Sequence, residues 1–330
     1  MQYNNNTKEV NREQREKDNE FKGVNRAHLH DNVKTDIHPT KEDRILDICI
    51  IVILAIIGIV TFYPLYLVLI SSFSDPTYIS SGKVWIMPRG LNLSAYKSLL
   101  NTKEIWIGYR NSIFYTVVGT FLQMVVTTAA AFALSRRTLP GRRWLMLLFI
   151  FPLYFSGGLI PTYLVVKDTG LINTVWALII PSLVGYYNLI LGRNYFENSI
   201  PEEIFESATV DGASVIRYFA QFAVPLSVPV LAVMTLNFAL GHWNQYFDAM
   251  IYINNDDIQT LQVFIRRITM QTTASLDGGR MELEEVVEQI QKTQLLKYAI
   301  VIVSSVPMIL LYPMIQKYFI KGIMIGAVKG

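Results

Sequence analysis

The apolar run 222–247 contains a cluster of side chains that could hold a polar solute. Its members are Asn237, His242, Trp243, Asn244 and Tyr246. Amide and imidazole groups exchange hydrogen bonds with hydroxyls, and aromatic faces offer an apolar surface on which a sugar ring can pack. The cluster therefore fits a path for a carbohydrate. The same residue types also form hydrogen bonds between membrane helices and aromatic belts at the membrane surface, so both interpretations stay open.

Residues for catalysis or nucleotide binding are missing from the sequence. No G-x-x-x-x-G-K-[ST] motif occurs, so the chain itself is not expected to bind or hydrolyse ATP. His242 is the only histidine outside residues 1–44 and Cys49 is the only cysteine, which leaves no Ser/His/Asp or Cys/His set. A proton-coupled transporter needs ionisable groups within the membrane, and only His242 and Asp248 qualify. We therefore expect no enzyme and no cofactor in this chain, and the net charge of +3 is too small to indicate nucleic acid binding.

Six apolar runs dominate the chain, in which 52% of residues are hydrophobic and 17% are charged. The runs, each without Asp, Glu, Lys or Arg, comprise residues 48–70, 112–134, 144–166, 174–192, 222–247 and 298–316. A helix needs about 20 apolar residues to cross a membrane, and one central Asp or Arg would cost about 2.5–3.5 kcal/mol on insertion. Six uncharged runs therefore predict an all-α membrane protein with six transmembrane helices. Prolines in or beside the runs predict kinked or broken helices.

Basic residues in the short connections predict how these helices are oriented. Loop 135–143 holds Arg136, Arg137, Arg142 and Arg143. Connection 167–173 holds a single lysine. Because Lys and Arg accumulate on the cytoplasmic side, we expect loop 135–143 and both termini to be cytoplasmic, and connections 71–111 and 254–294 to be outside. Within the latter, residues 281–298 have the pattern of an amphipathic helix that leads into the last run.

Residues 1–44 differ in composition from the rest of the chain. Basic and acidic residues balance one another there, and large apolar residues are few. Such a segment cannot bury enough apolar surface to offset its ordering entropy. The sequence therefore predicts a disordered cytoplasmic N-terminal tail, residues 1–44, and a six-helix membrane domain, residues 45–330.

Two short helices are predicted in the acidic loop between the fourth and fifth runs. Ser199–Glu202 has the pattern of a capping box that starts the first helix, with Pro201 in its first turn. Gly212 readily adopts the left-handed conformation, so the first helix should end there. Ser214 can cap a second helix that runs to Pro225. The apolar stripe of the first helix comprises Ile204, Phe205 and Ala208.

Residues 206–225, ESATVDGASVIRYFAQFAVP, resemble the cytoplasmic EAA loop that is the signature of ABC-importer permeases. That pattern has Glu-Ala-Ala, a glycine six residues after the glutamate, and a hydrophobic-x-hydrophobic-Pro ending. The matching residues are Glu206, Ser207, Ala208, Asp211, Gly212, Ala213, Phe222, Val224 and Pro225. Ser207 departs from the family's alanine and keeps a small side chain. In the family this loop forms the coupling helix, which docks into a cleft of the cytoplasmic ATPase subunit.

Other stretches narrow the resemblance. Residues 170–181 and 243–253 are similar to the carbohydrate-uptake branch typified by the maltose permeases, and residues 154–174 and 312–330 resemble a Gram-positive subgroup that handles complex oligosaccharides. The resemblance covers roughly residues 45–330. It implies the type I ABC importer permease fold, with six transmembrane helices and the coupling-helix loop between the fourth and fifth.

The resemblance also implies a role and a set of partners. The chain would be a multi-pass permease of the cell membrane that forms half of a translocation path for sugars, above all oligosaccharides. Its partners would be a second homologous permease, cytoplasmic ATP-binding subunits that hold ATP and Mg, and an extracellular solute-binding protein. An ABC importer for another solute and a secondary transporter are the alternatives. The loop at 206–225 favours the ABC importer, because a secondary transporter has no use for it.

The orientation can be tested by cysteine labelling after Cys49→Ser. We expect Thr138→Cys, in the arginine-rich loop, to react with a membrane-impermeant maleimide only after the membrane is opened. Thr169→Cys, in the connection expected outside, should react in intact cells. Labelling of Thr138→Cys in intact cells would reverse the predicted orientation.

Overall fold

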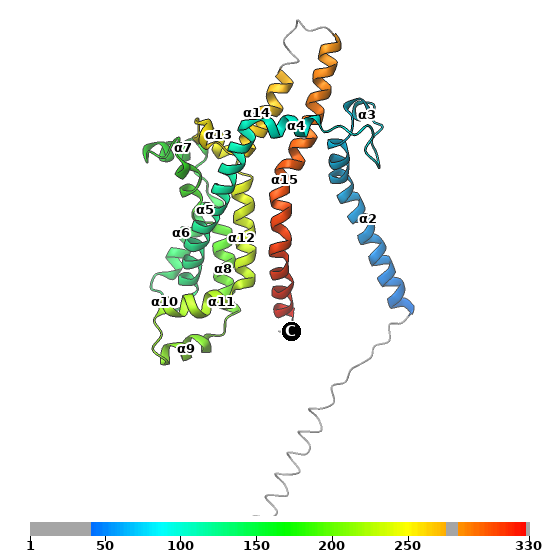
Figure 1. The fold of residues 1–330 in the computed structure, drawn as a ribbon. Coiled ribbons are helices and arrows are strands. Elements are labelled where there is room, and N and C mark those ends of the chain that lie inside the picture. Colours follow the sequence, from blue (N-terminus) through cyan, green and yellow to red (C-terminus); the bar gives the residue numbers. More distant parts are fainter. Residues whose placement is uncertain (1–40, 275–282, 328–330) are drawn as a thin grey trace, which may run out of the picture. The chain divides into compact units, whose positions relative to one another are not determined.

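Helices make up all the regular structure in residues 41–274 and 283–327, which a computed structural model describes (Figure 1). The longer helices are α2 (Lys41–Ser72), α4 (Ser94–Asn101), α5 (Lys103–Ser135), α6 (Arg142–Tyr154), α7 (Leu159–Asp168), α8 (Tyr186–Asn198), α9 (Glu202–Val210), α12 (Val228–Trp243), α14 (Leu261–Ala274) and α15 (Leu283–Ala327). The shorter ones are α3 (Pro76–Ser80), α10 (Val215–Tyr218), α11 (Val224–Leu226) and α13 (Phe247–Tyr252). Single turns complete the set: η1 (Val175–Leu178), η2 (Ile180–Ser182), η4 (Asp256–Ile258) and the π-helical turn η3 (Phe219–Ala223).

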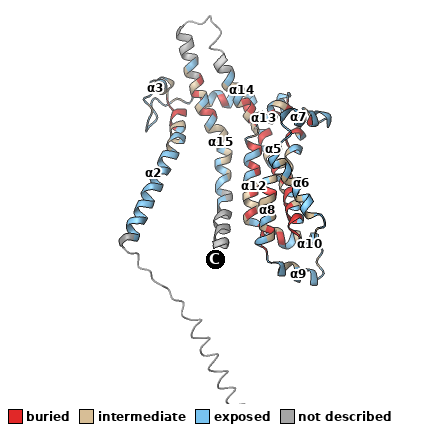
Figure 2. Cartoon of the chain, turned by 180° about the vertical axis from the view of Figure 1, so that it is seen from behind, coloured by how far each residue is buried: buried red, intermediate tan, exposed pale blue. Residues whose placement is uncertain are grey.

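The chain divides into two units, Met1–Phe62 and Tyr63–Gly330. The described part of the first unit is the beginning of α2, where residues 43–62 are exposed (Figure 2). The second unit holds all the other helices. The predicted tail, residues 1–44, lies outside the described residues except for Lys41–Arg44, which already belong to α2.

Three helical segments are long and apolar enough, by length and composition, to cross a membrane. They are Asp43–Ser72, Lys103–Ser135 and Thr293–Pro313. Three bent pairs meet the same criterion together: α6 with α7, Val175–Ser182 with α8, and Val215–Leu226 with α12. Each predicted apolar run falls on one of these six segments or pairs. The described residues therefore offer three spans, or up to six if each bent pair is one span, and the count of six stays a prediction.

The bends lie at glycines and prolines, as the sequence predicts. The 118° bend between α6 and α7 follows Pro152 and ends at Gly158, whose φ of 85° and ψ of 177° suit glycine alone. The 45° bend before α8 lies between Pro181 and Tyr186. The 83° bend before α12 lies at Ser227, between two prolines. Proline removes a backbone donor and clashes with the preceding turn, which explains why these runs do not form straight helices.

The second unit is organised around α5, which packs against α8, α12 and α14. Figure 2 shows the buried residues gathered on α5, α8 and α12. Close approach depends on glycines: a Cβ built on Gly119 of α5 would lie 2.6 Å from the imidazole of His242, and one on Gly108 would lie 2.8 Å from the Cα of Leu261. Small residues let membrane helices approach closely enough for packing and hydrogen bonds to hold them together.

The connections collect at two ends of this unit (Figure 1). At one end the side-chain oxygen of Asn173 accepts hydrogen bonds from the backbone of Asn254 and Asn255, at 3.1 and 2.9 Å. At the other end Glu197 forms an ion pair with Arg142, with 2.6 Å between Oε1 and Nη2. Connections 167–173 and 254–294 therefore begin on one side, and loop 135–143 and the loop that holds α9 lie on the other. This pairing agrees with the predicted topology; which end is cytoplasmic stays a prediction.

Two features of the fold were not foreseen. α14 is a 14-residue helix that packs on α5 and α15, in a connection for which the sequence predicted a helix only farther along. The amphipathic helix predicted at 281–298, of which the structure describes residues 283–298, is the first part of α15, a single helix of 45 residues that continues through the last apolar run.

Substitution of Gly119 should destabilise the helix bundle. In Gly119→Ala the new methyl group clashes with His242, and overpacking of this kind costs about 1–3 kcal/mol. Gly58→Ala is the matched control, because it lies in α2, where a Cβ meets nothing within 4 Å, and it gains the same helix propensity. Thermal unfolding of the purified complex should show a loss of stability only for Gly119→Ala. Equal melting temperatures for Gly119→Ala and Gly58→Ala would mean that α5 and α12 can move apart without loss of stability.

Candidate functional site

The loop that matches the EAA pattern begins differently from the prediction. The helix α9 starts at Glu202, and its N-cap is Pro201, which makes no side-chain cap hydrogen bond. Ser199 instead ends α8 as its C-cap. The predicted capping box is therefore wrong. The cause is local: Pro201 itself has an extended ψ of 137°, and the residue before a proline avoids the helical region, so the helix begins two residues later than a cap at Ser199 would require.

The end of α9 and the start of α10 follow the prediction. Gly212 has a φ of 77°. The backbone N–H of Ala213 donates to the carbonyl of Ala208 at 2.9 Å and that of Gly212 to Thr209 at 3.0 Å, which is the Schellman arrangement. The hydroxyl of Ser214 then accepts a hydrogen bond of 3.3 Å from the N–H of Arg217 and caps α10. The glycine bend between two short helices is confirmed.

The buried face of this loop packs on the ends of α5 and α8. The apolar cluster comprises Ala131, Phe132, Phe196, Ile200, Ala208, Tyr218 and Ala223, with Ile204, Phe205, Ala213 and Phe219 packed against it. The ring of Phe205 meets that of Tyr218 edge-on, with centroids 4.9 Å apart. The predicted stripe of Ile204, Phe205 and Ala208 thus faces the bundle. α9 and α10 are too short to be stable alone, and packing against the bundle stabilises them.

The opposite face of the loop combines exposed apolar and acidic groups. Val210 is 87% exposed and Ile216 is 79% exposed. Glu206, Ser207 and Asp211 are exposed beside them. Apolar groups that are exposed together with charged ones are available for contact with another protein. The EAA residues therefore divide into Ala208 and Ala213, which hold the loop, and those available to a partner.

The loop returns to the bundle through a π-helical turn. α10 continues without interruption into η3 and α11, and η3 immediately precedes Val224-Pro225. A π turn adds one residue to a helical turn and often lies at functional positions. The predicted second helix to Pro225 is therefore present, with this irregular turn in its middle.

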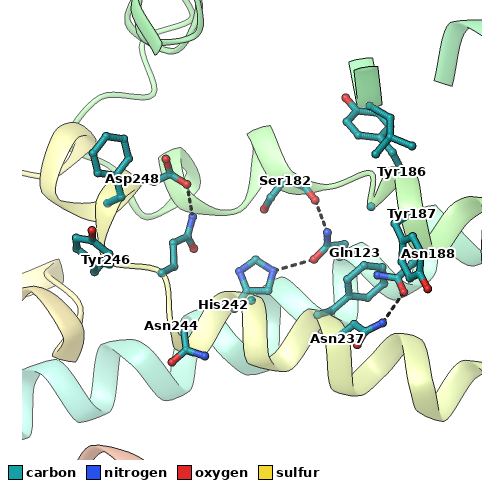
Figure 3. A pocket seen from close by; sticks show the side chains of 16 residues that line it. Gln123, Ser182, Tyr186, Tyr187, Asn188, Asn237, His242, Asn244, Tyr246 and Asp248 are labelled. Atoms are coloured by element: carbon teal, nitrogen blue, oxygen red, sulfur yellow. Dashed lines mark hydrogen bonds between the residues drawn. The ribbon is translucent and has the colours of Figure 1, made fainter. Parts of the chain in front are cut away.

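A second candidate site is a pocket of about 490 Å³ in the second unit (Figure 3). Polar and aromatic residues that line it are Gln123, Ser182, Tyr186, Tyr187, Asn188, Asn237, His242, Asn244, Gln245, Tyr246 and Asp248. Four of the five residues predicted for a solute path are among them. Tyr186, Tyr187 and Asp248 were not in that prediction. The sequence signal that could have indicated the two tyrosines is their position together, between a glycine and an asparagine, inside an apolar run.

Hydrogen bonds fix one wall of the pocket. The side chain of Gln123 donates to the carbonyl of Ser182 at 2.5 Å, and its oxygen lies 3.1 Å from Nε2 of His242. Farther along α12, Asn237 donates to the side-chain oxygen of Asn188 at 2.9 Å. In Figure 3 these pairs form a row between Asp248 and Tyr246 on one side and Tyr186 and Tyr187 on the other. The row joins α5, α8 and α12 by side chains that can also bind hydroxyl groups.

Trp243 lies apart from this pocket. Its side chain is 3% exposed, and its indole N–H donates to the carbonyl of Ser304 in α15 at 3.1 Å. Its ring also packs near Tyr109 of α5. The buried surroundings of Trp243 give it a role in joining α12 to α15.

Comparison with known proteins identifies the chain. Protein LplC of Bacillus subtilis (strain 168) is 38% identical over 294 residues, which cover 89% of this chain and 98% of LplC. The polygalacturonan/rhamnogalacturonan transport system permease protein YtcP of the same organism is 36% identical over 289 residues, 88% of this chain and 100% of YtcP. The chain belongs to the carbohydrate ABC-transporter permeases. No family model matches it.

A solved structure agrees with this assignment. A chain of a bacterial ABC transporter involved in the import of the acidic polysaccharide alginate superposes with a TM-score of 0.73 at 32% identity, over 85% of this permease and 98% of that chain. The permease is therefore a plasma membrane protein with the all-α fold of an ABC importer permease and is not an enzyme. Permeases of this family work with a second permease, ATPase subunits and a solute-binding protein. A secondary transporter, the alternative from another class, does not fit.

Substitutions in run 222–247 should separate pocket residues from packing residues. Asn244→Ala and Tyr246→Ala remove exposed side chains from the pocket wall, so we expect uptake by the reconstituted complex to fall several-fold while its melting temperature stays unchanged. Trp243→Ala removes a buried ring and should destabilise the permease by about 3–5 kcal/mol. Normal uptake by both pocket variants would leave helix packing as the only role of the cluster.

Proposed function

We propose that this permease forms half of the translocation path of an ATP-driven importer for oligosaccharides and is driven through the loop 202–226. The observation that carries the proposal is the two-faced structure of this loop in a member of the carbohydrate permease family. One face is packed on α5 and α8, and the other exposes Glu206, Val210 and Ile216.

The exposed face supports docking on a cytoplasmic ATPase subunit. Glu206 offers a carboxylate, and Val210 and Ile216 offer apolar surface on either side of the Gly212 bend. The buried face means that the loop cannot move freely on its own. A displacement imposed on it by the ATPase subunits would therefore reach the helices of the path. We place this loop and loop 135–143 in the cytoplasm, with both termini, because the arginines concentrate there.

The pocket supports an oligosaccharide as the solute. It pairs amide side chains with tyrosine and phenylalanine rings, which is the chemistry that hydroxylated rings require. One relative is named a polygalacturonan/rhamnogalacturonan permease, and another, 26% identical over 88% of this chain, is the melibiose/raffinose/stachyose import permease protein MelC of Bacillus subtilis (strain 168). Both names describe saccharides of more than one unit. Asn237, His242, Asn244 and Tyr246 are the residues that we propose for this permease's side of the path, and ATP and Mg would be held by its partners.

The N-terminal tail, residues 1–44, is proposed to be dispensable for this function. Its composition lacks the apolar surface that packing requires. The membrane domain, residues 45–330, contains both candidate sites.

Two substitutions in the loop test the coupling role. Glu206→Lys reverses the charge offered to the ATPase subunit. Gly212→Leu puts a side chain on a residue with φ of 77°, which costs about 1–2 kcal/mol, and aims that side chain at the docking face. We expect each to abolish uptake by proteoliposomes that contain the whole complex and loaded binding protein, and to reduce the stimulated ATPase activity.

Two controls match these changes at the other end of the unit. Asp168→Lys reverses an exposed acid in α7, and Gly170→Leu strains a glycine with φ of 71° that also has open space around it. Both should leave uptake near the wild-type rate. Wild-type uptake and stimulated ATPase activity in Glu206→Lys and Gly212→Leu would refute the coupling role of the loop.

A further inference from the structure

Arg136 was predicted only as one of the basic residues that orient the permease. It is the C-cap of α5, and it is 9% exposed, whereas its neighbour Arg137 is exposed. An arginine is almost never buried without partners for its charge, because removing a cation from water is costly. The partners of Arg136 therefore define what the residue does.

Three aromatic rings surround the guanidinium group of Arg136. Its central carbon lies 5.0 Å from the ring centre of Phe205, 5.1 Å from that of Phe132 and 6.0 Å from that of Tyr218. These rings come from three elements, α9, α5 and α10. A guanidinium group over an aromatic face is attracted by the negative charge of the ring face, and the attraction grows when water is excluded.

The charged partner of Arg136 is more distant. Its Nη1 lies 3.6 Å from Oε1 of Glu202, at the first position of α9, and the glutamate side chain is 60% exposed. That nitrogen makes no hydrogen bond among the described residues. Because the carboxylate of Glu202 is largely exposed and 3.6 Å is longer than a hydrogen bond, we take this ion pair as the weaker contact and the three rings as the main partners of Arg136.

The contact joins elements that the chain does not join directly. α9 is connected through the backbone to α8 and α10, whereas α5 lies far earlier in the sequence. α5 carries Gln123, a pocket residue, roughly 20 Å before Arg136 at a rise of about 1.5 Å per residue. The helix that would receive the ATPase motion and the helix that lines the pocket therefore meet around this side chain.

We propose that Arg136 is the positioning residue that ties the coupling helix α9 to α5, so that displacement of α9 moves α5 and the pocket wall with it. The inference rests on the coupling function proposed for the loop. The rings also contact one another, with ring centres 4.9 Å apart for Phe205 and Tyr218 and 6.1 Å apart for Phe132 and Tyr218, so the task assigned to the cation is to hold this packing in one arrangement. Phe132, Phe205 and Tyr218 could pack without it, but a guanidinium group contacts all three at once and holds them in one arrangement.

The test compares transport with ATP consumption in the same proteoliposomes. The complete complex, with its second permease, ATPase subunits and loaded binding protein, is prepared with Arg136→Met, Arg136→Lys or Arg137→Met. Methionine keeps an unbranched apolar side chain and removes the cation. We expect Arg136→Met to assemble and to transport about tenfold less oligosaccharide per ATP hydrolysed, the size expected for loss of a desolvated cation–π contact. Arg136→Lys should recover part of the wild-type ratio of oligosaccharide transported to ATP hydrolysed. Arg137→Met should have the same ratio as the wild type.

A ratio equal to wild type in assembled Arg136→Met would overturn the proposal, because packing alone would then suffice. If Arg136→Met does not assemble, Phe205→Leu decides: it removes one ring and keeps the arginine, and it should lower the ratio by a smaller factor. An unchanged ratio in Phe205→Leu would then overturn the proposal. Failure of the underlying function is distinct, because in that case Glu206→Lys and Gly212→Leu would also transport normally.

Discussion

The contact of α5 with α12 at Gly119 and His242 is the constraint on which the second unit depends. Membrane helices gain little from the hydrophobic effect when they associate, so close packing and hydrogen bonds must hold them. The missing side chain of Gly119 leaves room for the imidazole, and the imidazole reaches Gln123. Gln123 in turn binds the carbonyl of Ser182, in the irregular stretch before α8. One close approach thus fixes three elements and one wall of the pocket.

This arrangement explains how a broken helix is tolerated beside the pocket. A carbonyl released at a bend is costly in an apolar medium unless another group binds it. The amide of Gln123 binds the carbonyl of Ser182, and Thr127, also on α5, lies within 3.3 Å of both the carbonyl of Leu183 and the N–H of Gly185. The polar residues of α5 therefore supply the hydrogen bonds that the backbone of this neighbouring segment lacks. That segment can therefore remain irregular, and Tyr186 and Tyr187, which follow it at the start of α8, line the pocket.

The sequence allowed the helical class, the six apolar runs and the glycine bend of the loop to be predicted, because each depends on local composition or on one backbone conformation. Gly212 needs only its own φ, and Ser214 only the next turn. The bends in the runs were expected from proline, but their angles depend on what each segment packs against. Similarly, α14 is stabilised by α5 and α15, which no local pattern in residues 261–274 reveals.

Two pairs of adjacent residues show what the sequence pattern does not separate, because side-chain direction on a helix is decided by tertiary neighbours. His242 and Trp243 are adjacent, yet one lines the pocket and the other binds α15. Arg136 and Arg137 are adjacent as well, yet only one is buried among rings. A pattern that counts residue types assigns both members of each pair to the same role. The three-dimensional neighbours separate them.

The unbroken course of α15 has a mechanical consequence. At about 1.5 Å per residue its 45 residues extend roughly 68 Å, more than twice the roughly 30 Å of membrane hydrocarbon, so a large part of the helix must stand clear of the bilayer. Its first proline is Pro307, and the portion before it is free of such breaks. A tilt of about 10° within the membrane would displace a point roughly 35 Å farther along the rod by roughly 6 Å. α15 is thus a lever arm. A small rotation of its membrane-spanning part would produce a large displacement at α3, α4 and α14, the helices that contact it.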